Sequence, residues 1–394
     1  MRVFLSCMQA QRRHPLPAYS FWETYFKHGL EEAGHEWVEA AGIDWVEPLV
    51  TDDPRLVQRT WQRAIDYIRQ LQAERPIDLF LGYFFPKQID PAGVRAVRDL
   101  GIPTVNFFCD NVRDFRVVPT EFRAFDLHWV PEFKALVMYR DAGLNVVHAA
   151  MPVWVAPERR TCDHPERYGP TFIGRWDLQR DDLFGRAIQL GAPLVVRGPG
   201  WRGESSAAQQ PAAAASWTRR LSRLAKMART QGPLAPLWRM TYTRHRELRG
   251  RLPAAAVDAP VFGDDYVAVT QQSMVTIGTN RYPSFRRPFW NPDTYSRLRD
   301  IEAPVMGACY LTEWTEGLDQ MYELGREIET YRTAEELVEQ ISRLSADATR
   351  RTNLRLRGQQ RALADHCVGR SISAIGEALG IDRRTIATAS KSSA

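Results

Sequence analysis

The chain has 394 residues, of which 44% are hydrophobic and 25% charged, a composition that suits two folded domains with full cores. No run of about 18 apolar residues is present, and Arg12 and Arg13 follow the apolar start Val3–Leu5 too closely for a signal peptide. The five cysteines are scattered, without C-x-x-C spacing. They favour a reducing cytoplasm over a disulfide framework or a zinc site.

The first half of the chain alternates predicted strands and helices. A strand is expected at 2–7, followed by a loop through Pro15 and Pro17. A helix is expected to begin at Ser20, where the sequence S-F-W-E forms a capping-box pattern. Further strands are expected at 37–40, 77–82, 104–108, 127–130 and 146–149, with helices such as 54–73 and 91–100 between them. This rhythm is typical of a parallel sheet covered by helices on both faces.

The second half repeats the rhythm after a polar connection from Pro157 to Pro170 that suits a hinge. Predicted strands are 171–173, 194–196, 274–278, 309–311 and 327–331, and predicted helices are 182–190, 266–272, 333–344 and 347–364. We therefore predict an α/β fold with two Rossmann-like domains that face a cleft. The expected boundaries are 1–157, 158–370 and a C-terminal helix and tail at 371–394.

Positive charge is concentrated in one predicted insertion, residues 203–258. The segment holds ten basic and three acidic residues, a net charge of +7, while the whole chain carries +5. After a low-complexity run at 207–215, apolar residues recur at helical spacing from Trp217 to Ala228, and Arg and Lys side chains fill the rest of that helix. One interpretation is an interfacial helix on an anionic membrane, where each basic residue contributes about 1 kcal/mol. The other is an amphipathic helix packed on its own domain.

The stretch R-D-I-E-A-P-V-M-G-A-C-Y-L-T-E, residues 299–313, carries the clearest chemical signal. Arg299 and Glu302 share one helix face, Pro304 is expected to close that helix, Gly307 lies in a tight turn, and a short strand ends at Glu313. Ligands of open α/β sheets lie beyond the carboxyl ends of the strands. Glu302 could accept ribose hydroxyls and Arg299 could bind phosphate oxygens there. The alternative is a surface Arg–Glu pair.

These residues resemble a bacterial glycosyltransferase-like family, the spore maturation protein B-like proteins, within the two-domain GT-B transferases. The resemblance begins with the motif R-D-x-E-x-P-x-x-G at 299–307, followed by L-T-E at 311–313 and E-G-L at 316–318. It continues with A-E-E-L-V-E-Q-I at 334–341 and A-D-H at 364–366. Upstream it includes F-I-G-R at 172–175 and R-G-P-G-W at 197–201. It covers most of the C-terminal half. The N-terminal half matches more loosely, at 19–23, 34–36 and 102–110.

The resemblance implies transfer of a sugar from a nucleoside diphosphate, and a C-terminal helix that crosses back to the first domain. It also implies that a basic residue after the second domain's first strand stabilises the departing nucleotide in place of a metal. Gly174, at the end of that strand, and Arg180, at the start of the next helix, are the candidates for this part of the nucleotide-sugar site. A surface arginine is the alternative for Arg180, since Arg175 and Arg186 lie nearby in the sequence. Further candidates for the nucleotide-sugar site are Gly198, whose turn allows the backbone to approach a ligand closely, and Trp201, which offers an aromatic face. Gly307 and Glu313 are candidates for the same site.

Two residues of the first domain are candidates for catalysis. Asp110 follows a predicted strand, where related GT-B enzymes often show His-Asp, but Cys109 stands in place of the histidine. His14 lies in the loop after the first strand, and the ordinary pKa of histidine suits proton abstraction from an acceptor hydroxyl. A histidine merely solvated in its loop is the alternative for His14.

The sequence lacks the motifs that are typical of several other enzyme classes. The sequence has no phosphate-binding G-x-x-x-x-G-K-[ST] loop, no G-x-G-x-x-G after the first strand and no G-x-S-x-G elbow. It also lacks the D-x-D motif of metal-dependent transferases, so we expect neither a metal nor a cofactor.

The tail at 372–386 could instead form a helix-turn-helix, with Gly380 at the turn and Arg383 beginning a recognition helix. We favour the crossing helix, whose buried stripe would be Ile372, Ile375 and Leu379.

The sequence therefore predicts a metal-independent glycosyltransferase with an unidentified acceptor and no nucleic-acid partner. The first alternative is a catalytically silent sugar-nucleotide-binding or surface-assembly protein. The second alternative, which the sequence favours less, is a DNA-binding regulator.

Overall fold

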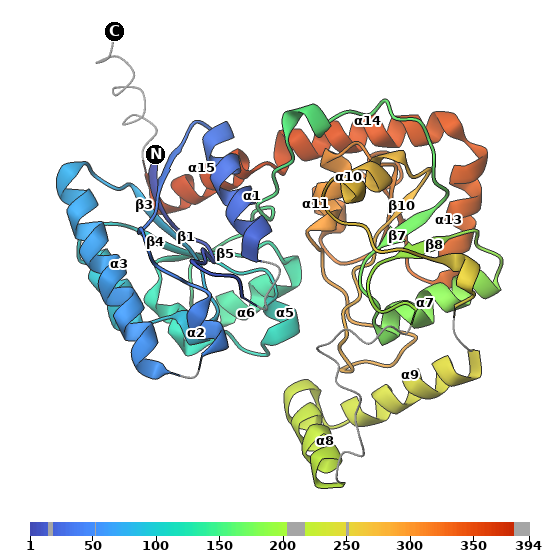
Figure 1. Ribbon diagram of the computed structural model, residues 1–394, viewed down its shortest axis with the longest axis horizontal. Helices are drawn as coiled ribbons and strands as arrows, with labels where there is room; N and C mark the ends of the chain where they lie inside the picture. Colours follow the sequence, from blue (N-terminus) through green and yellow to red (C-terminus); the bar gives the residue numbers. More distant parts are fainter. Residues whose placement is uncertain (15–18, 52, 203–216, 250–251, 382–394) are drawn as a thin grey trace. The chain divides into compact units, whose positions relative to one another are not determined.

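The computed structural model describes residues 1–14, 19–51, 53–202, 217–249 and 252–381, which form two compact units (Figure 1). The first unit comprises Met1–Trp154 and Ala364–Ala394, and the second comprises Val155–Leu363. Each unit is built on one parallel sheet of six strands. Among the described residues, no helix is both long and apolar enough to span a bilayer.

The sheet of the first unit has the strand order β2-β1-β3-β4-β5-β6. Every residue of β3 and β4 is buried, as expected for strands that helices cover on both faces. The strands are β1 (Arg2–Ser6), β2 (Glu36–Val38), β3 (Leu79–Tyr83), β4 (Thr104–Phe107), β5 (Leu127–Trp129) and β6 (Val146–Val147). The helices are α1 (Tyr19–Glu32), α2 (Glu47–Val50), α3 (Pro54–Glu74), α4 (Pro91–Arg98), α5 (Asn111–Asp114) and α6 (Leu136–Asp141).

The C-terminal helix α15 (Val368–Leu379) belongs to the first unit and packs against α1 and β5. Ile372 and Ile375 are fully buried in this contact, and the hydroxyl of Ser371 donates a hydrogen bond to the Ala150 carbonyl at 3.1 Å. The prediction of a crossing helix is thus confirmed. Arg383, on which the helix-turn-helix alternative depends, lies outside the described residues.

The sheet of the second unit has the strand order β12-β11-β10-β7-β8-β9. If β7 is counted as strand 1, the order read from β9 to β12 is 3-2-1-4-5-6, which is the order of the Rossmann fold. The direction in which the strands are added reverses between β7 and β10. Ligands of such sheets bind beyond the carboxyl ends of the strands at that reversal. The strands are β7 (Thr171–Ile173), β8 (Val195–Arg197), β9 (Val257–Asp258), β10 (Thr276–Ile277), β11 (Tyr310–Glu313) and β12 (Glu329–Tyr331).

Among the described residues of the second unit, six α-helices flank this sheet and two more lie in the basic insertion, most of them labelled in Figure 1. The six are α7 (Leu178–Gln189), α10 (Gly263–Gln272), α11 (Arg299–Val305), α12 (Leu318–Met321), α13 (Ala334–Ala346) and α14 (Ala348–Asp365). The basic insertion connects β8 to β9 and contains α8 (Trp217–Gln231) and α9 (Ala235–Arg249). Helix α9 packs against α7, and α8 packs against α9. The low-complexity run 207–215 lies outside the described residues.

Helix α11 does not end at Pro304, as the sequence predicted, but continues to Val305 with the proline inside it. A proline has no N–H to donate to the carbonyl four residues earlier, which here belongs to Asp300. The hydroxyl of Tyr322 donates to that carbonyl instead, at 2.8 Å. The helix therefore tolerates Pro304, and the turn follows at Gly307, whose φ is +74°.

Candidate functional site

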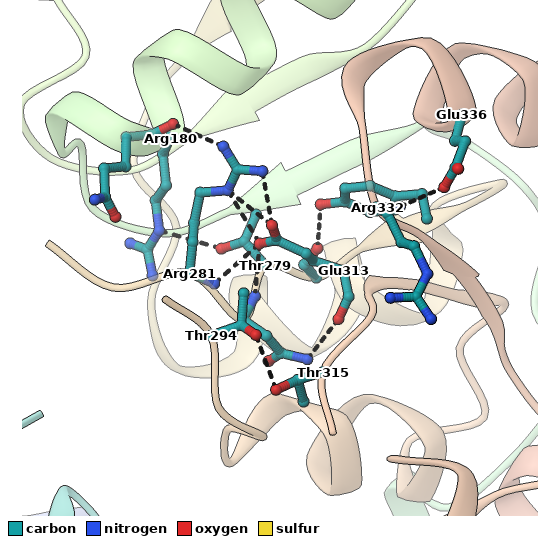
Figure 2. Close-up of polar contacts among 12 residues, drawn as sticks. Arg180, Thr279, Arg281, Thr294, Glu313, Thr315, Arg332 and Glu336 are labelled. Carbon is teal, nitrogen blue, oxygen red and sulfur yellow. Dashed lines mark hydrogen bonds and ion pairs between the residues drawn. The ribbon is translucent and has the colours of Figure 1, made fainter. Parts of the chain in front are cut away.

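Arg180 lies at the reversal point of the second sheet, in the first turn of α7. Its Nε contacts the Thr279 hydroxyl, just beyond β10, at 3.2 Å (Figure 2). Its Nη1 donates to the Arg175 carbonyl, just beyond β7, at 2.8 Å. The carboxylate of Asp177 lies 3.2 Å from Nε. Asp177 also accepts the first free N–H groups of α7, from Gln179 and Arg180. Two of the amides at this helix end are therefore already used, and the arginine side chain supplies positive charge at the reversal point.

Two further arginines share the electrostatic environment of Arg180. Burial lowers the pKa of Arg180 to about 10; Asp177 acts in the opposite direction, and the positive charges of Arg297 and Arg299 lower it further. Arg297 also donates from Nη2 to the Arg281 carbonyl at 3.3 Å, which ties it to the loop after β10. The positive charges of Arg297 and Arg299 thus lie near enough to Arg180 to lower its pKa, and the three guanidinium groups repel one another. A polyanion such as a diphosphate would relieve that repulsion.

A buried carboxylate fixes the segment that carries Arg297 and Arg299. Asp300 is fully buried and accepts hydrogen bonds at 2.9 Å from the hydroxyls of Tyr310 and Thr312 on β11. It also accepts from the Ser296 hydroxyl and the Arg297 amide, at 2.9 and 3.0 Å. Burial raises the pKa of Asp300, and these hydrogen bonds oppose that change. Asp300 therefore acts as a positioning residue for the arginines on either side.

Glu302 lies on the same helix as Arg299, and both contact Tyr266 of α10. The Tyr266 hydroxyl donates to the Glu302 carboxylate, and the Arg299 guanidinium lies 5.0 Å from the centre of the Tyr266 ring. Burial raises the pKa of Tyr266, so its hydroxyl keeps its proton and acts as the donor. The structure thus brings Arg299 and Glu302 together through a tyrosine that the sequence analysis did not single out.

Glu313 lies at the end of β11 and is buried against Arg281 (Figure 2). Its carboxylate accepts from Nη2 and Nε of Arg281 at 2.6 and 3.0 Å, and from the backbone amide of the same residue at 2.9 Å. Burial alone would lower the pKa of Arg281, but the adjacent Glu313 outweighs it and the pKa is raised. In the described structure Glu313 therefore fastens the loop after β10 to β11.

The glycine-rich turn after β8 packs tightly against the end of β7. Gly198 has a φ of +150°, and a Cβ at this position would come within 2.1 Å of the Gly174 carbonyl oxygen. Trp201 donates from its indole nitrogen to the same oxygen at 2.7 Å, and its ring belongs to the hydrophobic core. Gly307 lies against the Thr161 backbone, and Arg355 donates to its carbonyl at 3.1 Å. These residues shape the backbone of the second unit, and Trp201 does not present a free aromatic face.

A pocket of about 550 Å³ opens beside the loop after β10. Arg281 and Arg332 line it together with Trp290, Asp182 and His245. The Arg332 guanidinium lies 3.5 Å from the centre of the Trp314 ring, at the carboxyl end of β11. The pocket is therefore lined by both cationic and aromatic side chains.

In the first unit, His14 and Asp110 both lie beyond carboxyl ends of strands, after β1 and β4, and β3 separates these strands in the sheet. His14 is buried, and its Nε2 lies 2.8 Å from the carboxylate of Asp44. Asp110 is the N-cap residue of α5, and Arg113 lies 3.8 Å from its carboxylate. Burial raises the pKa of the neighbouring Cys109 thiol, which lies 3.6 Å from the Tyr83 hydroxyl. His14 is thus oriented by a carboxylate, as a general base requires.

Residues 183–375 match the model of a family described as glycosyl transferase-like. No curated protein matches the sequence. The solved structures that resemble the chain include HepE from Anabaena with UDP, at 12% identity and a TM-score of 0.57, covering 97% of this chain and 100% of HepE. Sucrose-phosphate synthase from Thermosynechococcus elongatus has 14% identity and a TM-score of 0.52, over 98% and 99% of the two chains.

The fold is that of the GT-B glycosyltransferases. The trehalose-6-phosphate synthase OtsA shares it as well, at 10% identity and a TM-score of 0.54, over 96% of this chain and 98% of OtsA. At these identities the structural likeness establishes the GT-B fold, and residues 183–375, most of them in the second unit, are similar to a glycosyl transferase-like family. Other HepE structures contain UDP and glucose, or UDP-glucose.

Proposed function

We propose that this protein is a glycosyltransferase that binds a nucleoside-diphosphate sugar on its second unit and transfers the sugar to an acceptor hydroxyl. The observation that carries the proposal is the group formed by Arg180, Arg297 and Arg299 at the reversal point of a Rossmann-type sheet. The glycosyl transferase-like match over 183–375 includes Arg297 and Arg299 and supports the same assignment.

These arginines match the charge that develops during glycosyl transfer. When the acceptor oxygen attacks the anomeric carbon, the bond to the diphosphate breaks and negative charge grows on the leaving group. Guanidinium groups fixed in advance stabilise this charge more in the transition state than in the bound donor. The Arg180 guanidinium is fixed by Asp177 and Thr279. Asp300 fixes the backbone at Arg297, whose guanidinium donates to the Arg281 carbonyl, and the Arg299 guanidinium lies over the Tyr266 ring. Glu302 would accept the ribose hydroxyls.

We further propose that donor binding requires no metal ion, because the three arginines supply the positive charge that a divalent cation supplies in other transferases. Calorimetric titration with UDP, with and without EDTA, tests this point. Unchanged affinity in EDTA supports the proposal, whereas loss of binding on chelation contradicts it.

The first unit would hold the acceptor, and His14 would remove the proton from its hydroxyl while Asp44 holds the imidazole in place and stabilises its positive charge. His14→Gln should then abolish transfer and leave donor binding on the second unit unchanged. Asp110 is the second candidate for this role. The motifs beginning at Arg299 suggest membership of the spore maturation protein B-like family.

The deciding experiment is a thermal-shift and turnover panel of UDP, GDP, ADP and dTDP with their sugars. A rise in melting temperature with one nucleotide, followed by sugar-dependent release of that nucleoside diphosphate, supports the proposal. Binding without any release would instead indicate a catalytically silent sugar-nucleotide-binding protein. No response to any nucleotide would contradict both.

A further inference from the structure

Helix α9 of the basic insertion exposes an apolar stripe on its outer side. Leu237, Met240 and Leu248 are 51%, 66% and 78% exposed. At 3.6 residues per turn they fall within about 80° of the helix circumference, over a length of about 16 Å. Soluble proteins normally turn such a stripe toward their core. This stripe therefore requires an explanation outside the fold of the second unit.

The opposite side of α9 already holds the helix on its domain. Ala235 and Tyr242 are buried there, and Arg246 pairs with Asp181 of α7 at 2.5 Å. The inner side is thus occupied, so the outer stripe is not a core face that has failed to pack. Figure 1 shows α8 and α9, in yellow, lying outside the layer formed by α7 and the sheet of this unit.

Neighbouring residues of the hairpin extend the apolar surface. Among the described residues thirteen large apolar side chains are exposed, and six of them fall between 221 and 248: Leu221, Leu224, Leu234, Leu237, Met240 and Leu248. Exposed apolar side chains gathered in this way mark an interaction surface, whereas single ones need no explanation.

The charge of the same two helices indicates what this surface contacts. The sequence from 217 to 249 contains nine arginine or lysine residues and one acidic residue, Glu247. Arg223 and Arg229 of α8 and Arg239 and Arg244 of α9 are exposed, and Arg244 lies within the apolar stripe itself. A protein partner with a complementary apolar face would not require so uniform a charge.

We infer that the α8–α9 hairpin docks the protein on the surface of an anionic lipid membrane. The leucine and methionine side chains of the stripe enter the boundary between headgroups and acyl chains, and the arginines lie among the lipid phosphates. This inference goes beyond the proposed glycosyl transfer and does not depend on it. It also differs from the sequence-based interpretation, because the apolar residues that enter the membrane lie mainly on α9.

Co-sedimentation of the full chain with lipid vesicles tests the inference. The protein should pellet with vesicles of phosphatidylcholine and phosphatidylglycerol mixed two to one, and not with vesicles of phosphatidylcholine alone. Raising the salt from about 0.05 to about 0.5 M should release it, because the screening length falls severalfold over that range.

Two sets of variants separate the apolar from the charged contribution. Replacing Leu237, Met240 and Leu248 together by serine should weaken vesicle binding at least tenfold. The matched control replaces Val50, Val117 and Val137 by serine; these are 42%, 76% and 59% exposed on the first unit, and the control should bind like the parent.

Replacing Arg223, Arg229 and Arg244 by glutamine should weaken binding about a hundredfold, since each basic residue near the surface contributes about fivefold. The matched control replaces Arg326, Arg343 and Arg357, which are exposed elsewhere on the second unit.

Circular dichroism and thermal unfolding of each variant establish that the fold is unchanged, so loss of vesicle binding is assigned to the hairpin. The inference is overturned if the parent ignores anionic vesicles at low salt, or binds neutral vesicles equally well. It is also overturned if light scattering shows a dimer that the serine variant loses, because the stripe would then bind a second copy of the chain.

Discussion

Replacing Arg180 with glutamine should separate the stability of the protein from its affinity for the donor. The Arg180 side chain is 15% exposed, and its pKa is lowered to about 10, first by burial and further by Arg297 and Arg299. Relative to the ordinary arginine value, this corresponds to roughly 3 kcal/mol of unfavourable free energy in the charged, unliganded state. The attraction of Asp177 is already contained in that pKa, so removal of the charge relieves the cost and loses in addition the hydrogen bonds to Thr279 and to the Arg175 carbonyl, about 1 kcal/mol each. The relief of roughly 3 and the loss of about 2 kcal/mol nearly cancel, so the free energy of unfolding should change by only about 1 kcal/mol.

Donor binding should respond very differently. A hydrogen bond to a charged group contributes about 1.5–3 kcal/mol, so Arg180→Gln should weaken binding of the nucleoside diphosphate by roughly 10- to 150-fold. Arg186→Gln removes the same charge from the same helix, where Arg186 pairs with Glu335 at the surface, and should bind the donor like the parent. Urea denaturation and calorimetric titration measure the two quantities. A folded Arg180→Gln protein that binds within threefold of the parent would refute the reasoning, as would a loss of stability above about 2 kcal/mol, which would make Arg180 a structural residue.

Three further variants test other parts of the structure. Glu302→Ala should weaken nucleotide binding by about 1–3 kcal/mol in calorimetry while the fold survives, and unchanged affinity would contradict its assignment to the ribose. Asp300→Ala leaves the buried hydroxyls of Tyr310 and Thr312 without their acceptor, and should lower the free energy of unfolding in urea by about 2–4 kcal/mol. Burial lowers the pKa of His128 to about 3, so its neutral form stabilises the fold above pH 6.5 and this contribution is lost as the pH falls toward 3. Between pH 7.5 and 5 the parent should lose about 2 kcal/mol that His128→Leu does not lose, and parallel pH profiles would count against this.

The sequence predicted the architecture because its signals are local. Strands such as 171–173 and 104–108 are short runs rich in β-branched and aromatic residues between turn residues, and the structure places β7 and β4 there. The spacing of Arg299 and Glu302 on one face of a helix is also a local property, and α11 confirms it. The end of that helix was misjudged at Pro304, because the Tyr322 hydroxyl that compensates for the proline comes from 18 residues further along the chain.

Much of the candidate site depends on contacts that no local pattern reveals. Arg297 and Asp300 become significant only when β11 supplies Tyr310 and Thr312 beside them. Trp201 follows a glycine-rich turn, where an aromatic ring could stack on a ligand. In the structure its indole nitrogen donates to the Gly174 carbonyl, and its ring packs in the core of the second unit. Likewise, the partner of His14 is Asp44, 30 residues away. Helical periodicity located apolar residues in α8, but whether such residues face the core or solvent is decided by the fold.

A crystal structure of the full chain with UDP would test the proposed donor site directly. Diphosphate oxygens within hydrogen-bonding distance of Arg180, Arg297 and Arg299, with the ribose against Glu302, are the predicted result. A nucleotide bound elsewhere on the second unit, with these three guanidinium groups turned away from its phosphates, would contradict the central claim.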